Sequence, residues 1–293
     1  MGLGHPECPA RLAAIEDRLR ASGLDLFMRR HDAPPAPMDA LLRVHGQEHV
    51  ERVLSTHPAH GEYVRIDPDT FMNECTAEAA RRAAGAAVLA VDLVLRKETQ
   101  FVFCAVRPPG HHAERNAPMG FCFFNNIAVA AGEALRRGIK RVAIVDFDVH
   151  YGNGTADIFD GDSRVLFLST YQHPLYPFWA GTPNQPGRVD VPLAPGAGTA
   201  EYRAAVEQRW LPAMQAFRPQ LILVSAGFDA HARDPLAGLN LSDEDYYWTA
   251  QQLLAVAARH GGGRVIASLE GGYEPHALAR CVEAFLRPFV VGA

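Results

Sequence analysis

Residues that can bind metals or move protons follow directly after several apolar segments of the chain. Asp148 and His150 lie two residues apart after one such segment, so their side chains point to the same side of an extended backbone. Asp146 shares this spacing, and Asp229 follows another apolar segment. Two carboxylates and one imidazole suit zinc, and three protein ligands leave the open position of a catalytic site. Oxygen-rich ligation also suits iron(II) or manganese, so the ligand types alone leave the metal open.

Two adjacent histidines, His111 and His112, follow a third apolar segment. Imidazole titrates near neutral pH, so at least one of the pair is a candidate general base or acid beside the metal. Tyr273 follows Gly271 and Gly272, which let the main chain approach the site closely. A phenol there can donate a hydrogen bond to an oxyanion, although packing in a loop is the simpler interpretation of that tyrosine alone.

These polar residues need a scaffold that brings distant segments together. Five apolar segments rich in β-branched residues lack clean alternation, as expected for strands covered on both faces. They are Phe101–Val106, Val142–Phe147, Val165–Ser169, Leu221–Ser225 and Val265–Leu269. Helical patterns occupy residues 77–95, 126–136, 200–217 and 244–260, with short helices at 39–42 and 47–55 and an irregular stretch at 176–198.

The alternation of strands and helices predicts an α/β fold in which a mostly parallel sheet is flanked by helices. No linker, repeat or low-complexity block interrupts the pattern, so residues 1–293 are expected to form one domain. In such sheets ligands bind at the carboxyl ends of the strands. The polar segments that follow four of the strands are therefore expected to converge in one crevice.

Composition argues against several other classes of protein. The 293 residues are 48% hydrophobic and 21% charged, which is typical of a globular chain. The formal charge of 28 − 33 = −5 gives no support for a nucleic-acid partner. The apolar stretch at residues 83–91 is far shorter than the ~20 residues of a membrane span, and no secretion signal opens the chain. Five scattered cysteines without a CxxC pair predict reduced thiols and a cytoplasmic location.

Several longer motifs resemble the histone deacetylase superfamily, especially its bacterial class II-like amidohydrolases. The matching segments are GHPECPARL, RPPGHHA, GFCFFNN, DFDVHYGNGT, SAGFDAHARDPLAG and LEGGY, which spread from Gly4 to about Leu286. The resemblance implies an arginase/deacetylase-like fold whose mostly parallel sheet has about eight strands. It also implies a zinc-dependent amidohydrolase that removes acetyl or related acyl groups from acylated lysine or a similar amine.

The resemblance assigns the metal to Asp148, His150 and Asp229. It also implies a role for each of five catalytic residues. His111 and His112 would flank the attacking water, with His112 acting as general base and later as general acid. Asp146 would orient His111, and Asn153 would orient His112. Tyr273 would polarise the acyl carbonyl together with the metal.

Further implied features surround this centre. Phe121 and Tyr176 would form the walls of a narrow channel for an alkyl stem, with Gly120 beside them and Leu236 near the mouth. A structural potassium ion is expected close to the metal. Its ligands would be side-chain and main-chain oxygens of Asp146, Asp148, His150 and Ser169.

Three features depart from the family pattern. Met1 lies three residues before Gly4, where relatives carry a first strand and a loop that lines the pocket, so a misplaced start or a missing strand is expected. Tyr151 replaces the usual histidine, which we interpret as a packing substitution. The aromatic segment at residues 174–179 is expected either to pack a long loop or to narrow the channel mouth.

Alternative functions remain open at this stage. Leu236 is apolar where relatives that prefer acetylated polyamines carry an acidic residue, which favours acyl-lysine over acetylpolyamine substrates. An arginase-like ureohydrolase would need two manganese ions, and Asp229 and Asp234 do not form the paired aspartates that such a site uses. A catalytically silent acyl-binding module would lack a ligand or Tyr273, and all are present. A homo-oligomer is possible, while no nucleic-acid or membrane partner is expected.

Overall fold

The fold is built on a parallel sheet of six strands. A computed structural model describes residues 1–2, 4–179 and 185–292. The strand order is β3-β8-β7-β4-β5-β6, and every neighbouring pair is parallel. The strands are β3 Phe101–Cys104, β4 Val142–Asp146, β5 Val165–Gln172, β6 Arg188–Leu193, β7 Leu221–Ala226 and β8 Val265–Leu269.

This strand count corrects the expectation of about eight strands in the main sheet. Among the described residues, the two other strands are β1 Val64–Arg65 and β2 Phe71–Met72, which form a separate antiparallel pair. Each has only two residues, so they close a tight turn and do not extend the sheet. The mostly parallel α/β architecture itself is confirmed.

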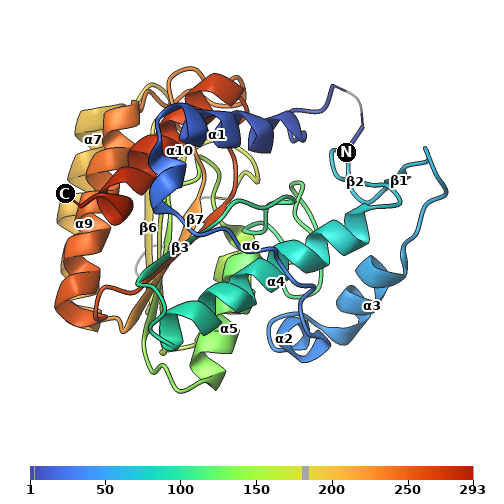
Figure 1. Cartoon of the computed structure of the whole chain (residues 1–293), viewed down its shortest axis with the longest axis horizontal. Helices are drawn as coiled ribbons and strands as arrows, with labels where there is room; N and C mark the ends of the chain where they lie inside the picture. The colour runs from blue at the N-terminus through green and yellow to red at the C-terminus, as the bar shows by residue number, and fades with distance from the viewer. Residues whose placement is uncertain (3, 180–184, 293) are drawn as a thin grey trace.

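Helices cover both faces of the sheet (Figure 1). One face packs against α1 Ala10–Ala21, α9 Asp243–His260 and α10 Pro275–Val290, together with the segment formed by α7 Thr199–Ala205, a π-helical turn at Val206–Trp210 and α8 Leu211–Phe217. The opposite face packs against α4 Thr76–Leu95, α5 Asn126–Arg136 and α6 Asn153–Ile158. The short helices α2 Met38–Leu42 and α3 Gln47–Ser55 pack outside α4 and α5, and a 3₁₀ turn at Leu24–Phe27 follows α1.

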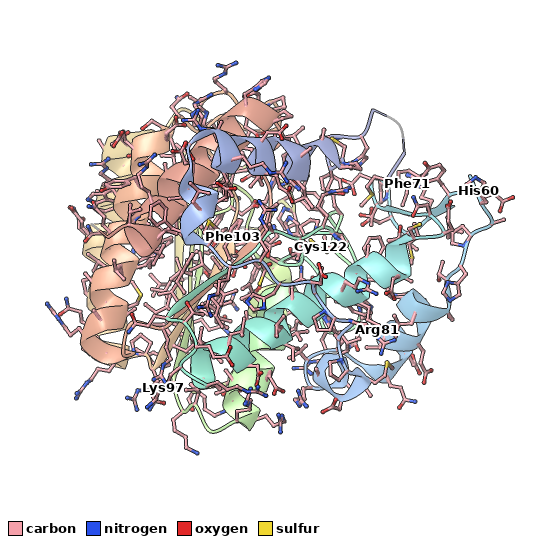
Figure 2. All side chains as sticks on the ribbon, in the orientation of Figure 1. His60, Phe71, Arg81, Lys97, Phe103 and Cys122 are labelled. Atoms are coloured by element: carbon pink, nitrogen blue, oxygen red, sulfur yellow. The ribbon has the colours of Figure 1, made fainter. Side chains whose placement is uncertain are left out.

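The central strands are apolar on both faces because both faces are buried. Along β4, Ala143 and Val145 face the α9–α10 layer, while Val142 and Ile144 face the α4–α5 layer. Burying one such valine or isoleucine side chain stabilises the fold by about 1.5–3 kcal/mol. Figure 2 shows side chains filling the space between the layers, with Cys122 inside and His60 and Lys97 at the periphery.

The sequence patterns located most elements, but not the edge strand β6 or the helices α1, α6 and α10. β8 has the predicted bounds, and the other four predicted strands agree within a few residues. β6 lies inside the stretch that we expected to be irregular, of which residues 180–184 are outside the described residues. Pro192 argued against a strand here, because proline is rare inside sheets. Strands at the edge of a sheet, such as β6, tolerate it. Among the described helices, none is long and apolar enough to cross a membrane.

Candidate metal centre and active site

The carboxyl ends of the central strands bring the three predicted metal ligands together. Asp148 and His150 follow β4, and Asp229 follows its neighbour β7. His150 Nδ1 lies 3.0 Å from Asp148 Oδ1 and 3.2 Å from Asp229 Oδ2. Ligand atoms bound at ~2.0–2.1 Å to a tetrahedral zinc ion would lie about 3.3 Å apart. The two distances from His150 therefore match a zinc-type site, and all three donor atoms lie within 4.8 Å of one another.

The remaining contacts of these carboxylates leave one oxygen for a cation. Asp229 Oδ1 accepts a hydrogen bond from the Val149 N–H at 2.8 Å, and Asp148 Oδ2 accepts one from the Gly271 N–H at 2.8 Å. Asp229 Oδ2 is buried without a hydrogen-bond partner. Burial, followed by the charge of Asp148, raises the pKa of Asp229 to about 7. A divalent ion would compensate this buried negative charge, so the residues fit the metal that the sequence predicts.

Gly271 allows the main chain to reach the metal ligands. A Cβ atom at this position would lie 2.0 Å from Asp229 Oδ2 and 2.6 Å from Asp148 Oδ2. Any other residue would therefore displace a ligand. The close approach that the Gly-Gly pair predicted is confirmed here.

His111 is bonded to a buried carboxylate. Its Nδ1 lies 3.0 Å from Asp146 Oδ2, and Asp146 Oδ1 accepts a hydrogen bond from the Asp148 N–H at 3.1 Å. Burial disfavours the imidazolium, but the charges of Asp148 and Asp146 outweigh burial and raise the pKa of His111 well above its ordinary value. Among the protein side chains alone, His111 therefore carries a positive charge.

His112 has a neutral partner and the opposite behaviour. Its Nδ1 lies 2.7 Å from Asn153 Oδ1. Burial, with the neighbouring His111 and His150, lowers the pKa of His112 well below its ordinary value. A neutral imidazole whose Nδ1–H is donated to Asn153 has a free lone pair on Nε2. His112 is therefore the residue of the pair that can accept a proton.

Tyr273 lies in a loop that is held from two sides. Its N–H donates to Asp234 Oδ2 at 2.6 Å, and the guanidinium of Arg11 lies 5.0 Å from the centre of its ring. Burial raises the pKa of Tyr273 well above its ordinary value. The phenol therefore keeps its proton and serves as a hydrogen-bond donor.

Three of the four predicted channel residues contact the catalytic groups. The ring of Tyr176 is perpendicular to that of His112 at a centroid distance of 5.1 Å, and Phe121 stands edge-on to Tyr273 at 6.0 Å. Gly120 has a positive φ of 55°, and a Cβ atom there would lie 2.5 Å from His112 Cδ2. Leu236 is 37% exposed, and its N–H is bonded to Asp234 at 3.0 Å.

A network from the N-terminal segment supports the Tyr273 loop, and the sequence analysis assigned it no role. Arg11 is fully buried and donates to the carbonyl oxygens of Gly272, at 2.7 Å, and Glu270. Glu7 forms ion pairs with Arg11 and Arg107. The signal that could have found this network was the GHPECPARL motif, whose two charged residues are both buried.

An acidic turn beside the channel wall was also missed. Asp67 Oδ2 accepts a hydrogen bond from the Gly120 N–H at 3.3 Å, and Thr70 Oγ1 accepts one from the Phe121 N–H at 2.9 Å. Burial and the adjacent Asp67 raise the pKa of Asp69 to about 6. The D-x-D-T spacing of residues 67–70 was the available signal. Two carboxylates here favour a cationic substrate.

The structure also accounts for Tyr151 and for Ser169. Tyr151 is buried, its hydroxyl donates to Asp190 Oδ1 at 3.2 Å, and its ring packs against Tyr171 and Trp179. This arrangement agrees with a packing substitution. Ser169 pairs with Asp146 in the sheet register, and its hydroxyl is buried without a hydrogen-bond partner.

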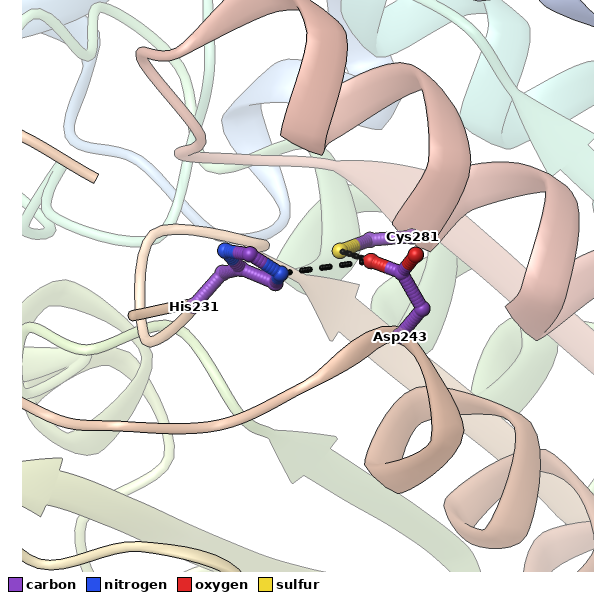
Figure 3. A group of neighbouring side chains, drawn as sticks. All are labelled: His231, Asp243 and Cys281. Carbon is purple, nitrogen blue, oxygen red and sulfur yellow. Dashed lines mark hydrogen bonds and ion pairs between the residues drawn. The ribbon is translucent and has the colours of Figure 1, made fainter. Parts of the chain in front are cut away.

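A second group of possible metal ligands joins the loop after β7 to α9 and α10. Figure 3 shows His231, Asp243 and Cys281 close together. His231 Nδ1 accepts a hydrogen bond from the Arg233 N–H at 3.1 Å, so a neutral His231 carries its proton on Nε2 and donates to Asp243 Oδ1 at 3.2 Å. Arg280 Nε lies 2.8 Å from Asp243 Oδ2. With no free imidazole lone pair and a cation alongside, we interpret this group as a hydrogen-bonded link between elements.

A buried carboxylate–imidazole centre at the carboxyl edge of a parallel sheet, beside two histidines and a tyrosine, defines a deacetylase-like amide hydrolase class. Comparison with known proteins agrees. The histone deacetylase domain family matches residues 5–289. The chain is 40% identical over 278 residues to the histone deacetylase-like amidohydrolase of Pseudomonas aeruginosa, covering 92% of this chain and 73% of that protein.

Two further relatives support the same conclusion. A probable deacetylase of Archaeoglobus fulgidus is 40% identical over 278 residues, covering 92% of this chain and 76% of the relative. The solved HDA15 HD domain superposes with a TM-score of 0.90 at 35% identity, covering 99% of this chain and 84% of that chain. The chain therefore belongs to the histone deacetylase family and has its arginase/deacetylase-like fold.

Proposed function

We propose that this protein is a zinc-dependent amidohydrolase that removes acetyl or related acyl groups from acylated lysine. The observation that carries the proposal is the arrangement around the three metal ligands. The neutral ring of His112 lies 5.8 Å from the ring of the ligand His150. The protonated phenol of Tyr273 comes two residues after Gly271, whose N–H binds the ligand Asp148. A proton acceptor and an oxyanion donor beside a metal site are what amide hydrolysis requires.

The residues divide the reaction between them. A zinc ion held by Asp148, His150 and Asp229 would acidify water and polarise the acyl carbonyl. His112 Nε2 takes the proton of the attacking water, and the Tyr273 hydroxyl donates a hydrogen bond to the developing oxyanion. The His112 imidazolium then gives its proton to the leaving amine.

The surroundings of the centre favour a cationic chain with one acylated amine. Phe121 and Tyr176 line the approach to the catalytic groups and suit an alkyl stem. Asp67 and Asp69 lie beside this wall, where they suit lysine-rich peptides. They suit a polyamine as well, so acetylated polyamines are the second candidate substrates. Leu236 places an apolar group near the mouth and favours the lysine substrate.

Three accompanying assignments belong to the same proposal. Iron(II) would also fit the three ligands, since two of them are carboxylates. The buried, unpartnered hydroxyl of Ser169 next to Asp146 supports a structural potassium ion held by side-chain and carbonyl oxygens of Asp146, Asp148, His150 and Ser169. A cytoplasmic location follows from the scattered, unpaired cysteines.

Turnover by zinc-loaded protein tests the proposal. We expect hydrolysis of a fluorogenic acetyl-lysine or trifluoroacetyl-lysine peptide, with slower turnover of acetylspermidine. Tyr273→Phe keeps the ring but removes the oxyanion donor, so kcat should fall by about 10²–10³-fold. Faster acetylspermidine turnover would replace the lysine assignment by the polyamine one. Stoichiometric zinc binding without turnover of any of these substrates would instead support an acyl-binding module.

A further inference from the structure

The amide of Asn153 is bonded on both of its sides. Its Oδ1 lies 2.7 Å from His112 Nδ1, and its Nδ2 donates to Glu114 Oε1 at 2.8 Å. An asparagine side chain presents an acceptor on one side and a donor on the other, with almost the same shape in both orientations. The group bonded to the far side of the amide therefore decides which side faces the histidine.

The orientation of this amide determines whether His112 can act as a base. With the oxygen toward His112, Nδ1 keeps its proton and Nε2 has the free lone pair. With the amide reversed, the NH₂ group would donate to Nδ1, and the proton would move to Nε2. Glu114 Oε1 accepts the hydrogen bond from the amide nitrogen and so selects the first orientation, with Met119 Sδ as a weaker acceptor at 3.3 Å.

The main chain aims Glu114 at the amide without help from its carboxylate. The Glu114 N–H donates to the Ala117 carbonyl at 2.9 Å, and the Glu114 carbonyl accepts a hydrogen bond from His45 Nδ1 at 3.0 Å. The next residue, Arg115, donates its N–H to Asp157 Oδ2 at 2.8 Å. Glu114 itself is only partly buried. Its replacement should therefore leave the loop in place.

We propose that Glu114 is a positioning residue of the reaction. It orients the Asn153 amide and thereby holds His112 in the tautomer whose Nε2 accepts the proton of the attacking water. This assignment rests on the amidohydrolase function proposed above. It extends the pair His112–Asn153 to a chain of three side chains that ends in the Glu114 carboxylate. The Asn153 amide needs this third group to fix its orientation. An aspartate in place of Asn153 would not need it, because both of its oxygens accept hydrogen bonds.

Steady-state kinetics of the zinc-loaded full chain test this role. Glu114→Ala should lower kcat on the acetyl-lysine peptide about 10-fold or more and leave KM within about 3-fold, as expected for a group that acts through a partner of the base. Glu114→Gln should lose less activity than Glu114→Ala, because its side-chain oxygen can still accept from Asn153 although its NH₂ group can also donate. Asp157→Ala is the matched control, since it removes the side chain that binds the Arg115 N–H and keeps the side chains of Glu114 and Asn153, and its kcat should not change.

A double variant tests whether Glu114 acts through Asn153. Because both residues serve one hydrogen-bonded chain, Glu114→Ala should cost nothing further in a protein that already carries Asn153→Ala. Additive losses in the double variant would overturn the proposal. An Asp157→Ala loss as large as that of Glu114→Ala would overturn it too, since loop order would then explain both.

A spectroscopic measurement separates this proposal from the proposed function. In ¹⁵N-histidine-labelled, zinc-loaded protein, the ring nitrogens of His112, assigned by comparison with His112→Gln, should show a protonated Nδ1 and an unprotonated Nε2. Glu114→Ala should move the spectrum toward the other tautomer, and Glu114→Gln should move it less. A shifted tautomer in a protein that hydrolyses no substrate would support the positioning role and refute the amidohydrolase function. An unshifted tautomer in an active enzyme would refute the positioning role alone.

Discussion

His111 and His112 are consecutive in the chain, yet they belong to two different environments. His111 faces the strand ends, where the buried Asp146 binds its Nδ1 and Glu270 accepts a hydrogen bond from its N–H at 3.1 Å. His112 faces the loop side, where its partner is the neutral amide of Asn153. The pKa of His111 is raised and that of His112 is lowered, although both are buried.

The difference shows that the charges around each ring decide its role. Burial alone would lower both pKa values, because it disfavours the charged imidazolium. On the sheet side, the carboxylates reverse this effect and stabilise a fixed positive charge. On the loop side, Asn153 adds no charge, so burial and the neighbouring histidines determine the pKa and a lone pair stays available. One histidine is therefore suited to electrostatic stabilisation and the other to proton transfer.

The largest effect should come from removing the metal ion, beside which both His111 and His112 lie. Asp229→Ala deletes the ligand whose Oδ2 is buried and unpartnered, and it should abolish binding of one zinc ion per chain. Activity should then fall to the background of the assay. Elemental analysis after dialysis, alongside turnover, checks this outcome. Full zinc occupancy in Asp229→Ala would show that the metal lies elsewhere, for instance at His231, Asp243 and Cys281.

A smaller effect, on stability, should appear when only the loop that carries Glu114 is weakened. His45 accepts a hydrogen bond from the Asn125 N–H on Nε2 at 2.9 Å and donates from Nδ1 to the Glu114 carbonyl, so a second ring proton would break this pattern. Burial, followed by the charge of His49, lowers the pKa of His45 from 6.5 to about 3. In the unfolded chain, His45 therefore binds a proton below about pH 6.5, whereas in the folded protein it binds one only below about pH 3. The folded protein loses stability as the pH falls from about 6.5 to about 3.

Chemical denaturation of wild type and His45→Gln measures this contribution. The variant loses hydrogen bonds and should be less stable at pH 7.5, but it lacks the titrating group. The difference in unfolding free energy between the two proteins should therefore shrink by about 2 kcal/mol between pH 7.5 and pH 5. A difference that stays constant with pH would mean that His45 titrates normally in the folded protein.

The sequence predicted the metal ligands better than the residues that hold the active-site loops in place. Asp148, His150 and Asp229 could be found because metal ligands must have particular side-chain types, and strand ends bring them to one edge. Arg11 and Glu114 were missed as functional residues. Arg11 acts on main-chain carbonyls 259 and 261 residues away, and Glu114 acts on a side chain 39 residues away. Such contacts leave no local periodicity, and the GHPECPARL motif alone does not show which distant atoms Arg11 binds.

The central strands of the sheet were predictable from local sequence, whereas the edge strand β6 was not. β4, β7 and β8 were predictable because burial on both faces demands continuous apolar runs. β6 was not, since one side of an edge strand has no hydrogen-bonding neighbour and therefore tolerates Arg188, Asp190 and Pro192. The expectation of about eight strands came from the family resemblance, and the described residues form six in the main sheet.

The most direct test of the account is kcat for His112→Ala and His111→Ala, measured side by side on the acetyl-lysine peptide with zinc content verified. Loss of the proton acceptor should lower kcat about 10²–10⁴-fold. Loss of His111 should cost at least about 10-fold less, because its charge stabilises the reaction without moving a proton. Equal losses, or a larger loss in His111→Ala, would contradict the assignment of the general base to the histidine with the neutral partner.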